Sequence, residues 1–346
     1  MSPAGVASLG AAGVVISLRG LTKQYADLTA VDGISFEVRR GEIFGILGPN
    51  GAGKTTTLEM IEGLSRPDDG EVVVDDLPVW PDPTRVKARI GVQLQATALF
   101  DFLRLHEIIR LFGSCYGVRR STADIDALLD RVGLLEKRGS FAAQLSGGQA
   151  QRLSIALALV NDPVVTFLDE PTTGLDPRAR RALWDVIRAI NEAGTTVVLT
   201  THYMEEAERL CERVAVMDHG HVMALDTPRA LVHGLGADAH ITFTLSAPVP
   251  VSDLCELDGV STCAAHEAEG YSLVADDAQR AVVSLLGLAA QRELEVKNLD
   301  VQGANLEDVF LQMTGRKLAE EEEEDEGGEK VEKPRRRAFL FGRGGR

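Results

Sequence analysis

The feature that most constrains this chain is an eight-residue segment, GPNGAGKT, at Gly48–Thr55. The apolar run Ile43–Leu47 precedes it, and a helix-compatible stretch, Thr56–Gly63, follows it. The segment therefore lies where a strand turns into a helix. Its glycines allow a tight backbone whose N–H groups point at an anion, next to the positive end of the following helix. This pattern predicts a phosphate-binding loop that consists of Gly48, Pro49, Asn50, Gly51, Ala52, Gly53, Lys54, Thr55 and Thr56.

Two side chains of this loop have predicted roles in binding ATP and Mg²⁺. Lys54 reaches the β and γ phosphates, which also makes it a candidate catalytic residue. Thr55 offers its hydroxyl to Mg²⁺, a hard cation that prefers oxygen ligands and keeps several waters. A glycine-rich turn that merely contains a lysine is the alternative for this segment taken alone.

Composition limits what the rest of the chain can be. The 346 residues are enough for about two domains, and 45% of them are hydrophobic. No run of eighteen or more uncharged apolar residues is present, so no membrane span is predicted. The formal net charge of −16 argues against a nucleic-acid partner, because phosphate backbones bind basic surfaces. The four cysteines show no CxxC spacing, and we expect reduced thiols.

The order of hydrophobic patterns predicts two domains. Between Val14 and Asp226, short β-branched runs alternate with helical segments, which is typical of an α/β domain with a largely parallel sheet. Within it, residues 95–145 show helical patterns only. An alternating strand at Ile241–Leu245 then opens a small α+β unit. The predicted division is a flexible N-terminus at 1–13, a nucleotide-binding domain at 14–235 with its helical subdomain at 95–145, an accessory domain at 236–316, and a disordered charged tail at 317–346.

The predicted tail separates its charges. Glu320–Glu326 is an unbroken acidic run, whereas Lys333–Arg346 is basic and contains Phe339 and Phe341. Such a segment is either a solvated extension or a contact with an anionic membrane surface, where each Lys or Arg contributes about 1 kcal/mol.

Two further strand ends carry catalytic candidates. VVTFLDE ends in Asp169, which is suited to hold Mg²⁺, and Glu170, which is placed to orient and deprotonate the attacking water. His202 follows the strand in LTTH, where an imidazole can hydrogen-bond the γ phosphate and that water. Gln95, at the head of the helical segment, is the predicted amide ligand of Mg²⁺, and Gln93 is the competing candidate.

A second predicted anion site lies at LSGGQ. The helical pattern that follows places this motif at a helix N-terminus, and its binding residues are Ser146, Gly147, Gly148 and Gln149. One domain does not need two phosphate-binding sites for one nucleotide. Two copies facing head to tail explain both, since each LSGGQ would then close on the ATP of its partner. For the pentapeptide alone, a serine-capped helix after a glycine turn is the alternative.

In this order, the motifs resemble the nucleotide-binding domain of ATP-binding cassette (ABC) proteins. The resemblance rests on the P-loop, the glutamine segment, LSGGQ, LDE, GLDP at Gly174–Pro177 and His202, and it covers Val14–Asp226. It implies that Tyr25 stacks on adenine, that Asp176 crosses the dimer interface, and that Gln95 is the metal-sensing glutamine.

The last predicted helix indicates which subfamily of ABC proteins the chain resembles. NLEDVFLQMTGR at Asn305–Arg316 resembles the accessory domain of daunorubicin/doxorubicin-resistance ABC exporter ATPases, which pair with a separate ABC-2 type membrane permease. An amphipathic helix that closes a small domain explains its apolar spacing equally well.

We therefore expect an ATP-hydrolysing exporter subunit, homodimeric and peripheral at the cytoplasmic face of the cell membrane, that drives efflux of a drug, antibiotic or lipid. The alternatives are a soluble ABC ATPase acting on ribosomes, DNA or cluster assembly, and an importer ATPase. A single intact cassette and an acidic surface disfavour the first, and the accessory domain disfavours the second.

Overall fold

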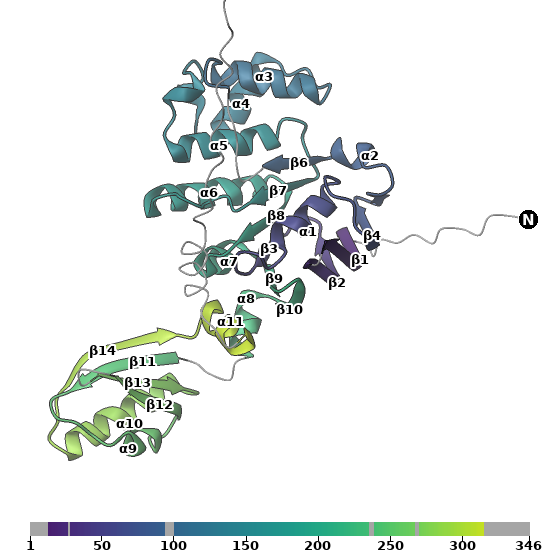
Figure 1. The fold of residues 1–346 in the computed structure, drawn as a ribbon. Helices are drawn as coiled ribbons and strands as arrows, with labels where there is room; N and C mark the ends of the chain where they lie inside the picture. The colour runs from purple at the N-terminus through teal and green to yellow at the C-terminus, as the bar shows by residue number, and fades with distance from the viewer. Residues whose placement is uncertain (1–12, 27, 94–99, 235–238, 267–269, 315–346) are drawn as a thin grey trace, which may run out of the picture.

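The computed structural model describes residues 13–26, 28–93, 100–234, 239–266 and 270–314. The predicted flexible N-terminus, except Gly13, and the predicted tail 317–346 lie outside these residues. Figure 1 shows a mixed α/β body from which a small α+β domain projects. No helix in the described ranges has the length and apolar character to cross a membrane.

The body is built on a six-stranded sheet in the order β10-β9-β3-β8-β7-β6. All neighbouring pairs are parallel except β9 and β10, which form an antiparallel hairpin around Gly220. The predicted α/β fold with a largely parallel sheet is therefore confirmed. The strands are β3 (Ile43–Leu47), β6 (Ile90–Gln93), β7 (Val165–Asp169), β8 (Thr196–Thr201), β9 (Arg213–Asp218) and β10 (His221–Asp226).

The central sheet is buried on both faces, which explains its continuous apolar strands. In β3, Ile43 and Leu47 belong to one hydrophobic cluster and Phe44 and Ile46 to the other, because successive side chains point to opposite faces. The first face packs against α5 (Gly147–Ala158), α6 (Pro177–Glu192) and α7 (Met204–Leu210).

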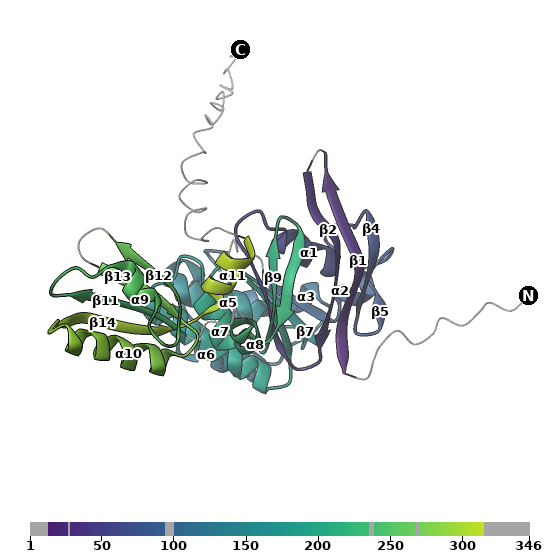
Figure 2. The same cartoon turned by 90° about the horizontal axis from the view of Figure 1, so that it is seen from below.

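A second, antiparallel sheet of order β2-β1-β4-β5 covers the other face together with α1. The sequence pattern did not separate this sheet from the parallel one. Its long strands pair along most of their length, and Figure 2 shows them standing at one end of the body. The elements are β1 (Val14–Tyr25), β2 (Leu28–Arg39), β4 (Asp69–Val74), β5 (Leu77–Pro78), α1 (Lys54–Ile61) and the short α2 (Thr84–Lys87).

Residues 100–145 add helices at the top of Figure 1. Their described elements are α3 (Leu105–Cys115), α4 (Thr122–Arg131), η1 (Leu135–Lys137) and η2 (Ala142–Gln144). The apolar side of α3, including Leu105, Ile108 and Ile109, is fully buried in the cluster shared with α5. The insertion is thus joined to the body through the helix that begins at LSGGQ.

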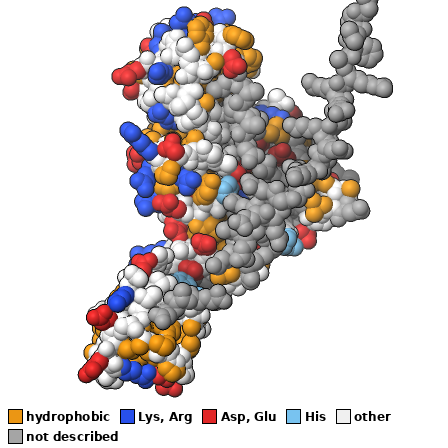
Figure 3. Space-filling view, turned by 60° about the vertical axis from the view of Figure 1, so that its left-hand side comes forward, with side chains coloured by type: hydrophobic (Ala, Val, Ile, Leu, Met, Phe, Trp, Pro, Cys, Tyr) orange, Lys and Arg blue, Asp and Glu red, His pale blue; other side chains and the backbone are white. Residues whose placement is uncertain are grey.

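The accessory domain is a four-stranded antiparallel sheet, in the order β12-β13-β11-β14, with α9 and α10 on one face. Ala281, Leu285 and Ala289 of α10 are buried against the sheet, whereas Val283 and Leu286 on the opposite side are exposed. Figure 3 shows hydrophobic side chains on the surface of the lower domain. The elements are β11 (Ala239–Leu245), α9 (Val251–Cys255), β12 (Val260–His266), β13 (Gly270–Ala275), α10 (Ala278–Gln291) and β14 (Val296–Gly303).

The helix α11 (Leu306–Thr314) leaves the accessory sheet and returns to the body. It packs against α7 and α8 (Pro228–His233), and its Leu306, Val309 and Phe310 are fully buried in the cluster of the nucleotide-binding domain. The backbone N–H of Leu306 also donates to Glu208 Oε1 at 2.7 Å. Of the predicted unit 236–316, the sheet therefore has its own core, whereas the last helix shares the core of the body.

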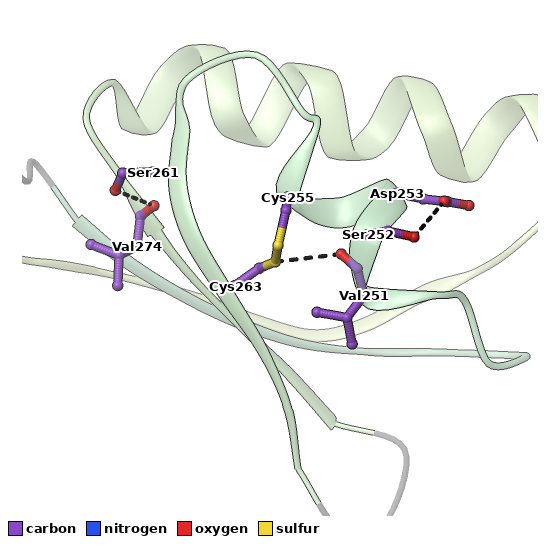
Figure 4. The surroundings of a disulfide bond; sticks show 7 residues. All are labelled: Val251, Ser252, Asp253, Cys255, Ser261, Cys263 and Val274. Carbon is purple, nitrogen blue, oxygen red and sulfur yellow. Dashed lines mark hydrogen bonds between the residues drawn. A yellow bond between two sulfur atoms is a disulfide. The ribbon is translucent and has the colours of Figure 1, made fainter.

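The expectation of four reduced cysteines is wrong for one pair. Cys255 at the end of α9 and Cys263 in β12 form a disulfide, with Cα atoms 5.4 Å apart (Figure 4). Their eight-residue separation showed no motif, but the turn between helix and strand brings the two side chains together. Cys115 is exposed and Cys211 is buried, both as free thiols.

Candidate functional site

The predicted phosphate loop lies at the carboxyl end of β3, between β8 and β9. The Gly48 N–H donates to Thr201 O at 3.3 Å, and a Cβ on Gly48 would lie 2.3 Å from Met217 O. Gly53, at φ +97°, has the left-handed backbone that favours glycine, and its Cβ would lie 2.3 Å from Ala30 O. Glycine at both positions is therefore required by the fold. The other predicted nucleotide contacts lie in this loop and the first turn of α1: Pro49, Asn50, Gly51, Ala52, Lys54, Thr55 and Thr56.

Lys54 is buried inside this loop. Its Nζ donates to Gly48 O at 2.8 Å and to Pro49 O at 2.9 Å, and it lies 3.5 Å from Glu170 Oε1. The ammonium is therefore held among oxygen atoms at the place where the loop would hold a phosphate. Phosphate oxygens can replace these acceptors without the loss of a hydrogen bond.

Asp169 and Thr55 bring oxygen ligands together next to the loop. The Thr55 hydroxyl lies 3.3 Å from both carboxylate oxygens of Asp169, and Thr200 Oγ1 donates to Asp169 Oδ1 at 2.5 Å. A carboxylate and a hydroxyl are the few protein ligands that Mg²⁺ takes when phosphates and waters complete its shell. The donor set therefore fits this ion.

Glu170 is surrounded by groups that stabilise its charged form. His202 Nδ1 lies 3.4 Å from Glu170 Oε1, and the Thr173 hydroxyl donates to Oε2 at 3.2 Å. The hydrogen bond from His202 lowers the pKa of Glu170 to about 2, against the effect of burial and with help from the Lys54 charge. The backbone of Glu170 is also in the left-handed region, at φ 45°, a strained geometry that clusters at functional sites.

Thr200 is a contact that the sequence reasoning missed. Besides its bond to Asp169, its hydroxyl accepts the backbone N–H of Glu170 at 2.9 Å, so one side chain positions both carboxylates. The signal was present, since Thr200 and Thr201 are hydroxyl residues at the end of an otherwise apolar strand directly before His202. A buried hydroxyl in such a strand needs a polar partner.

The predicted adenine platform, Tyr25, precedes the phosphate loop in the sequence, and the predicted glutamine, Gln95, follows it. Tyr25 ends β1 and is 45% exposed, with its hydroxyl 3.3 Å from Ser65 Oγ, so its ring is accessible for stacking. Gln95 lies outside the described residues and stays a prediction. Gln93, the competing candidate, is the last residue of β6 and its side chain is buried.

The LSGGQ segment forms a separate site on the body. Ser146 caps α5, where its hydroxyl accepts the N–H of Gln149 at 3.4 Å, and Gln149 Oε1 accepts the N–H of Ser146 at 3.0 Å. Asp176 caps α6 through two backbone N–H groups, each at 2.9 Å. Both caps line a cavity of about 550 Å³ with Arg152 and Arg178. Gly147 is the first residue of α5, and Gly148 also lines the cavity. No residue of the phosphate loop lines this cavity.

Comparison with known proteins shows the family to which the chain belongs. The family model described as ABC transporter matches residues 31–173. A linearmycin resistance ATP-binding protein of Bacillus subtilis is 36% identical, over 88% of this chain and 99% of that protein. The chain belongs to the ABC transporter ATP-binding proteins. A Nod factor export ATP-binding protein of Ralstonia nicotianae is 39% identical, over 88% of this chain and 95% of that protein.

Solved cassette structures share the fold of this ABC protein. An ATP-binding subunit of an ABC transporter matches with a TM-score of 0.57 at 29% identity, over 64% of this chain and 93% of that one. A dimeric cassette in a post-hydrolysis state, bound to ADP and Pi, matches with a TM-score of 0.56 at 29% identity. The match covers 61% of this chain and 98% of that one. The chain is accordingly an ABC-type ATP hydrolase.

Proposed function

We propose that this chain is the energy-coupling ATPase of an exporter that pairs with an ABC-2 type permease at the cytoplasmic face of the cell membrane. The observation that carries the proposal is the convergence of Lys54, Asp169, Glu170 and His202 at one edge of the parallel sheet. The relatives named for antibiotic resistance and for export favour efflux over uptake, with a drug, antibiotic or lipid as cargo.

Each residue of the centre has its own role in ATP binding or hydrolysis. Lys54 exchanges its carbonyl acceptors for phosphate oxygens when ATP binds. Thr55 and Asp169 would hold Mg²⁺, with Gln95 as the proposed third ligand, and the ion would there supply positive charge to the phosphates. Tyr25 stacks on the adenine ring.

Glu170 orients and deprotonates the attacking water, and His202 holds both the carboxylate and the γ phosphate. In the structure the His202 hydrogen bond and the Lys54 charge keep the pKa of Glu170 low, which makes it a weak base. Movement of Lys54 toward the phosphates removes one of these charges. Binding of ATP then raises the basicity of Glu170.

The separate LSGGQ cavity supports a head-to-tail homodimer. Its helix cap at Ser146 and the guanidinium groups of Arg152 and Arg178 provide positive potential away from the chain's own phosphate loop. We infer that this face closes on the nucleotide of a second copy, with Asp176 at the interface.

The test compares ATP hydrolysis by the full chain alone and in proteoliposomes with the permease encoded beside it. We expect recruitment to these proteoliposomes and a change in turnover. Turnover that ignores the permease, together with no recruitment, would favour the soluble ABC ATPase instead.

A further inference from the structure

A buried glutamate that has no role in the proposed mechanism lies next to the segments that carry the catalytic residues. Glu206 belongs to the first turn of α7, and none of its surface is exposed. The indole N–H of Trp184, on α6, donates to Glu206 Oε1 at 3.0 Å. A buried carboxyl group needs partners for both of its oxygens, and this bond supplies a partner for one.

Two hydroxyl groups lie close to the same carboxyl group. Burial raises the pKa of Glu206, and the hydroxyls of Thr201 and Thr172 oppose this rise together with the Trp184 N–H. Glu206 Oε2 and Thr172 Oγ1 are both buried, and neither completes a hydrogen bond within the described part of the chain. The Thr172 hydroxyl is therefore near the carboxyl group without full hydrogen-bond geometry, and a small movement joins them.

Thr201 belongs to the segment that carries His202. It is the last residue of β8 and directly precedes the histidine. Its hydroxyl accepts the N–H of Tyr203 at 2.9 Å, and its carbonyl accepts the N–H of Gly48 at 3.3 Å. A contact at Thr201 therefore acts on the backbone on both sides of His202.

Thr172 belongs to the segment that carries Glu170. It is fully buried, and its carbonyl accepts the N–H of Leu175 at 3.2 Å. The next residue, Thr173, contacts Glu170 twice, since its N–H donates to Glu170 O at 3.3 Å and its hydroxyl donates to Glu170 Oε2 at 3.2 Å. A displacement of Thr172 therefore moves a turn that holds the catalytic carboxylate.

We propose that Glu206 is a positioning residue for ATP hydrolysis, which bridges the segment that carries His202 and the segment that carries Glu170. It acts through the two threonines and does not itself contact the nucleotide. Glu170 Oε1 and His202 Nδ1 lie 3.4 Å apart, and this contact depends on the placement of both segments. Misplaced catalytic groups slow the chemical step more than they weaken binding, because the transition state has the stricter geometry.

The alternative is a purely structural role, since Glu206 also joins α7 to α6 through Trp184. The two roles use different contacts of one carboxyl group. Trp184→Phe is therefore the matched control, because it removes the indole donor, keeps an aromatic ring in the core and leaves Thr201 and Thr172 in place.

The experiment measures ATP hydrolysis and binding of a fluorescent ATP analogue by the full chain. Glu206→Ala should lower kcat about tenfold or more, with KM and the Kd of the analogue within about twofold of the wild type. Glu206→Gln should keep most of the wild-type kcat, because an amide can accept from Trp184 and donate to a threonine hydroxyl. Trp184→Phe should unfold at a lower urea concentration and keep kcat within about twofold.

Two results overturn the proposal. One is a Glu206→Ala variant whose kcat stays within about twofold of the wild type. The other is a Trp184→Phe variant that loses as much kcat as Glu206→Ala, since the effect then follows the packing of α6 and α7.

The proposal rests on the roles proposed for Glu170 and His202, and Glu170→Gln measured beside the other variants tests them separately. Normal turnover by Glu170→Gln refutes the proposed centre. An inactive Glu170→Gln together with a normal Glu206→Ala refutes the role of Glu206 alone. The measurement needs no permease, so it does not depend on the identity of the exporter.

A pair of substitutions at Thr172 tests the bridge even if Glu206→Ala does not fold. Thr172→Val removes the hydroxyl that faces Glu206, and Thr172→Ser keeps it. We expect Thr172→Val to lower kcat by about threefold or more without weaker binding of the analogue, and Thr172→Ser to stay closer to the wild type. Equal kcat values for the Val and Ser variants would show that the hydroxyl does not act in the bridge, and the proposal would be wrong.

Discussion

Replacement of Glu62 by Gln should stabilise the isolated chain, and the gain should depend on pH in a defined way. The pKa of Glu62 is raised from 4.5 to about 8, mainly by burial. An acid with a raised pKa in the folded state keeps a proton that the unfolded chain releases, so it destabilises the fold increasingly as pH rises from 4.5 to about 8. The penalty is about 3 kcal/mol at pH 7 and about 5 kcal/mol above pH 8, from about 1.4 kcal/mol for each pH unit.

The quantity to measure is the change with pH of the difference in unfolding free energy between the wild type and Glu62→Gln. The buried Gln amide has its own desolvation cost, but this cost does not change with pH and cancels from the slope. Urea unfolding of the wild type and of Glu62→Gln at pH 6, 7 and 8 should show a difference in unfolding free energy that grows by about 1.4 kcal/mol for each unit. Glu59→Gln is the control, and its difference should change much less with pH, because the charge of Glu59 is only a minor cause of the raised pKa of Glu62. A difference for Glu62→Gln that is constant with pH would refute the reasoning.

Four other substitutions test the site and the fold. Glu170→Gln should keep ATP binding, lose at least about a hundredfold in turnover and trap a dimer on size exclusion, and a monomer with normal turnover would contradict the assignment. Lys54→Ala should weaken binding of a fluorescent ATP analogue, because it removes the buried cation of the loop. Phe310→Ala should lower the free energy of unfolding by about 3–5 kcal/mol and speed hydrogen exchange in α11. Exchange in α11 that stays slow would argue against docking of this helix on the body. Cys255→Ser should lower the stability of the accessory domain by about 2–3 kcal/mol, and a reductant should then affect only the wild type, which retains the Cys255–Cys263 bond.

The residues of the catalytic centre could be predicted from short sequence segments, because each of them belongs to a motif of a few consecutive residues. Gly51 and Gly53 of the phosphate loop have left-handed backbones that favour glycine, and Asp169, Glu170 and His202 stand at the ends of apolar strands. In a parallel sheet such strand ends meet at one edge, so alternating strands and helices were enough to bring these residues together.

The sequence by itself therefore determined the α/β fold, the phosphate loop and the polar groups at the strand ends. The tertiary structure decided which distant segments share a core. The apolar spacing of α11 predicted a buried face but not that Phe310 packs on the body, and eight residues between Cys255 and Cys263 did not show that a turn joins them. Glu62 is the clearest case, since its sequence position shows only an acid after a helix. Its burial, with no ion pair or side-chain hydrogen bond to another described residue, depends on β6 and the end of α3, which pack around it from elsewhere in the chain, and desolvation is a property of that packing.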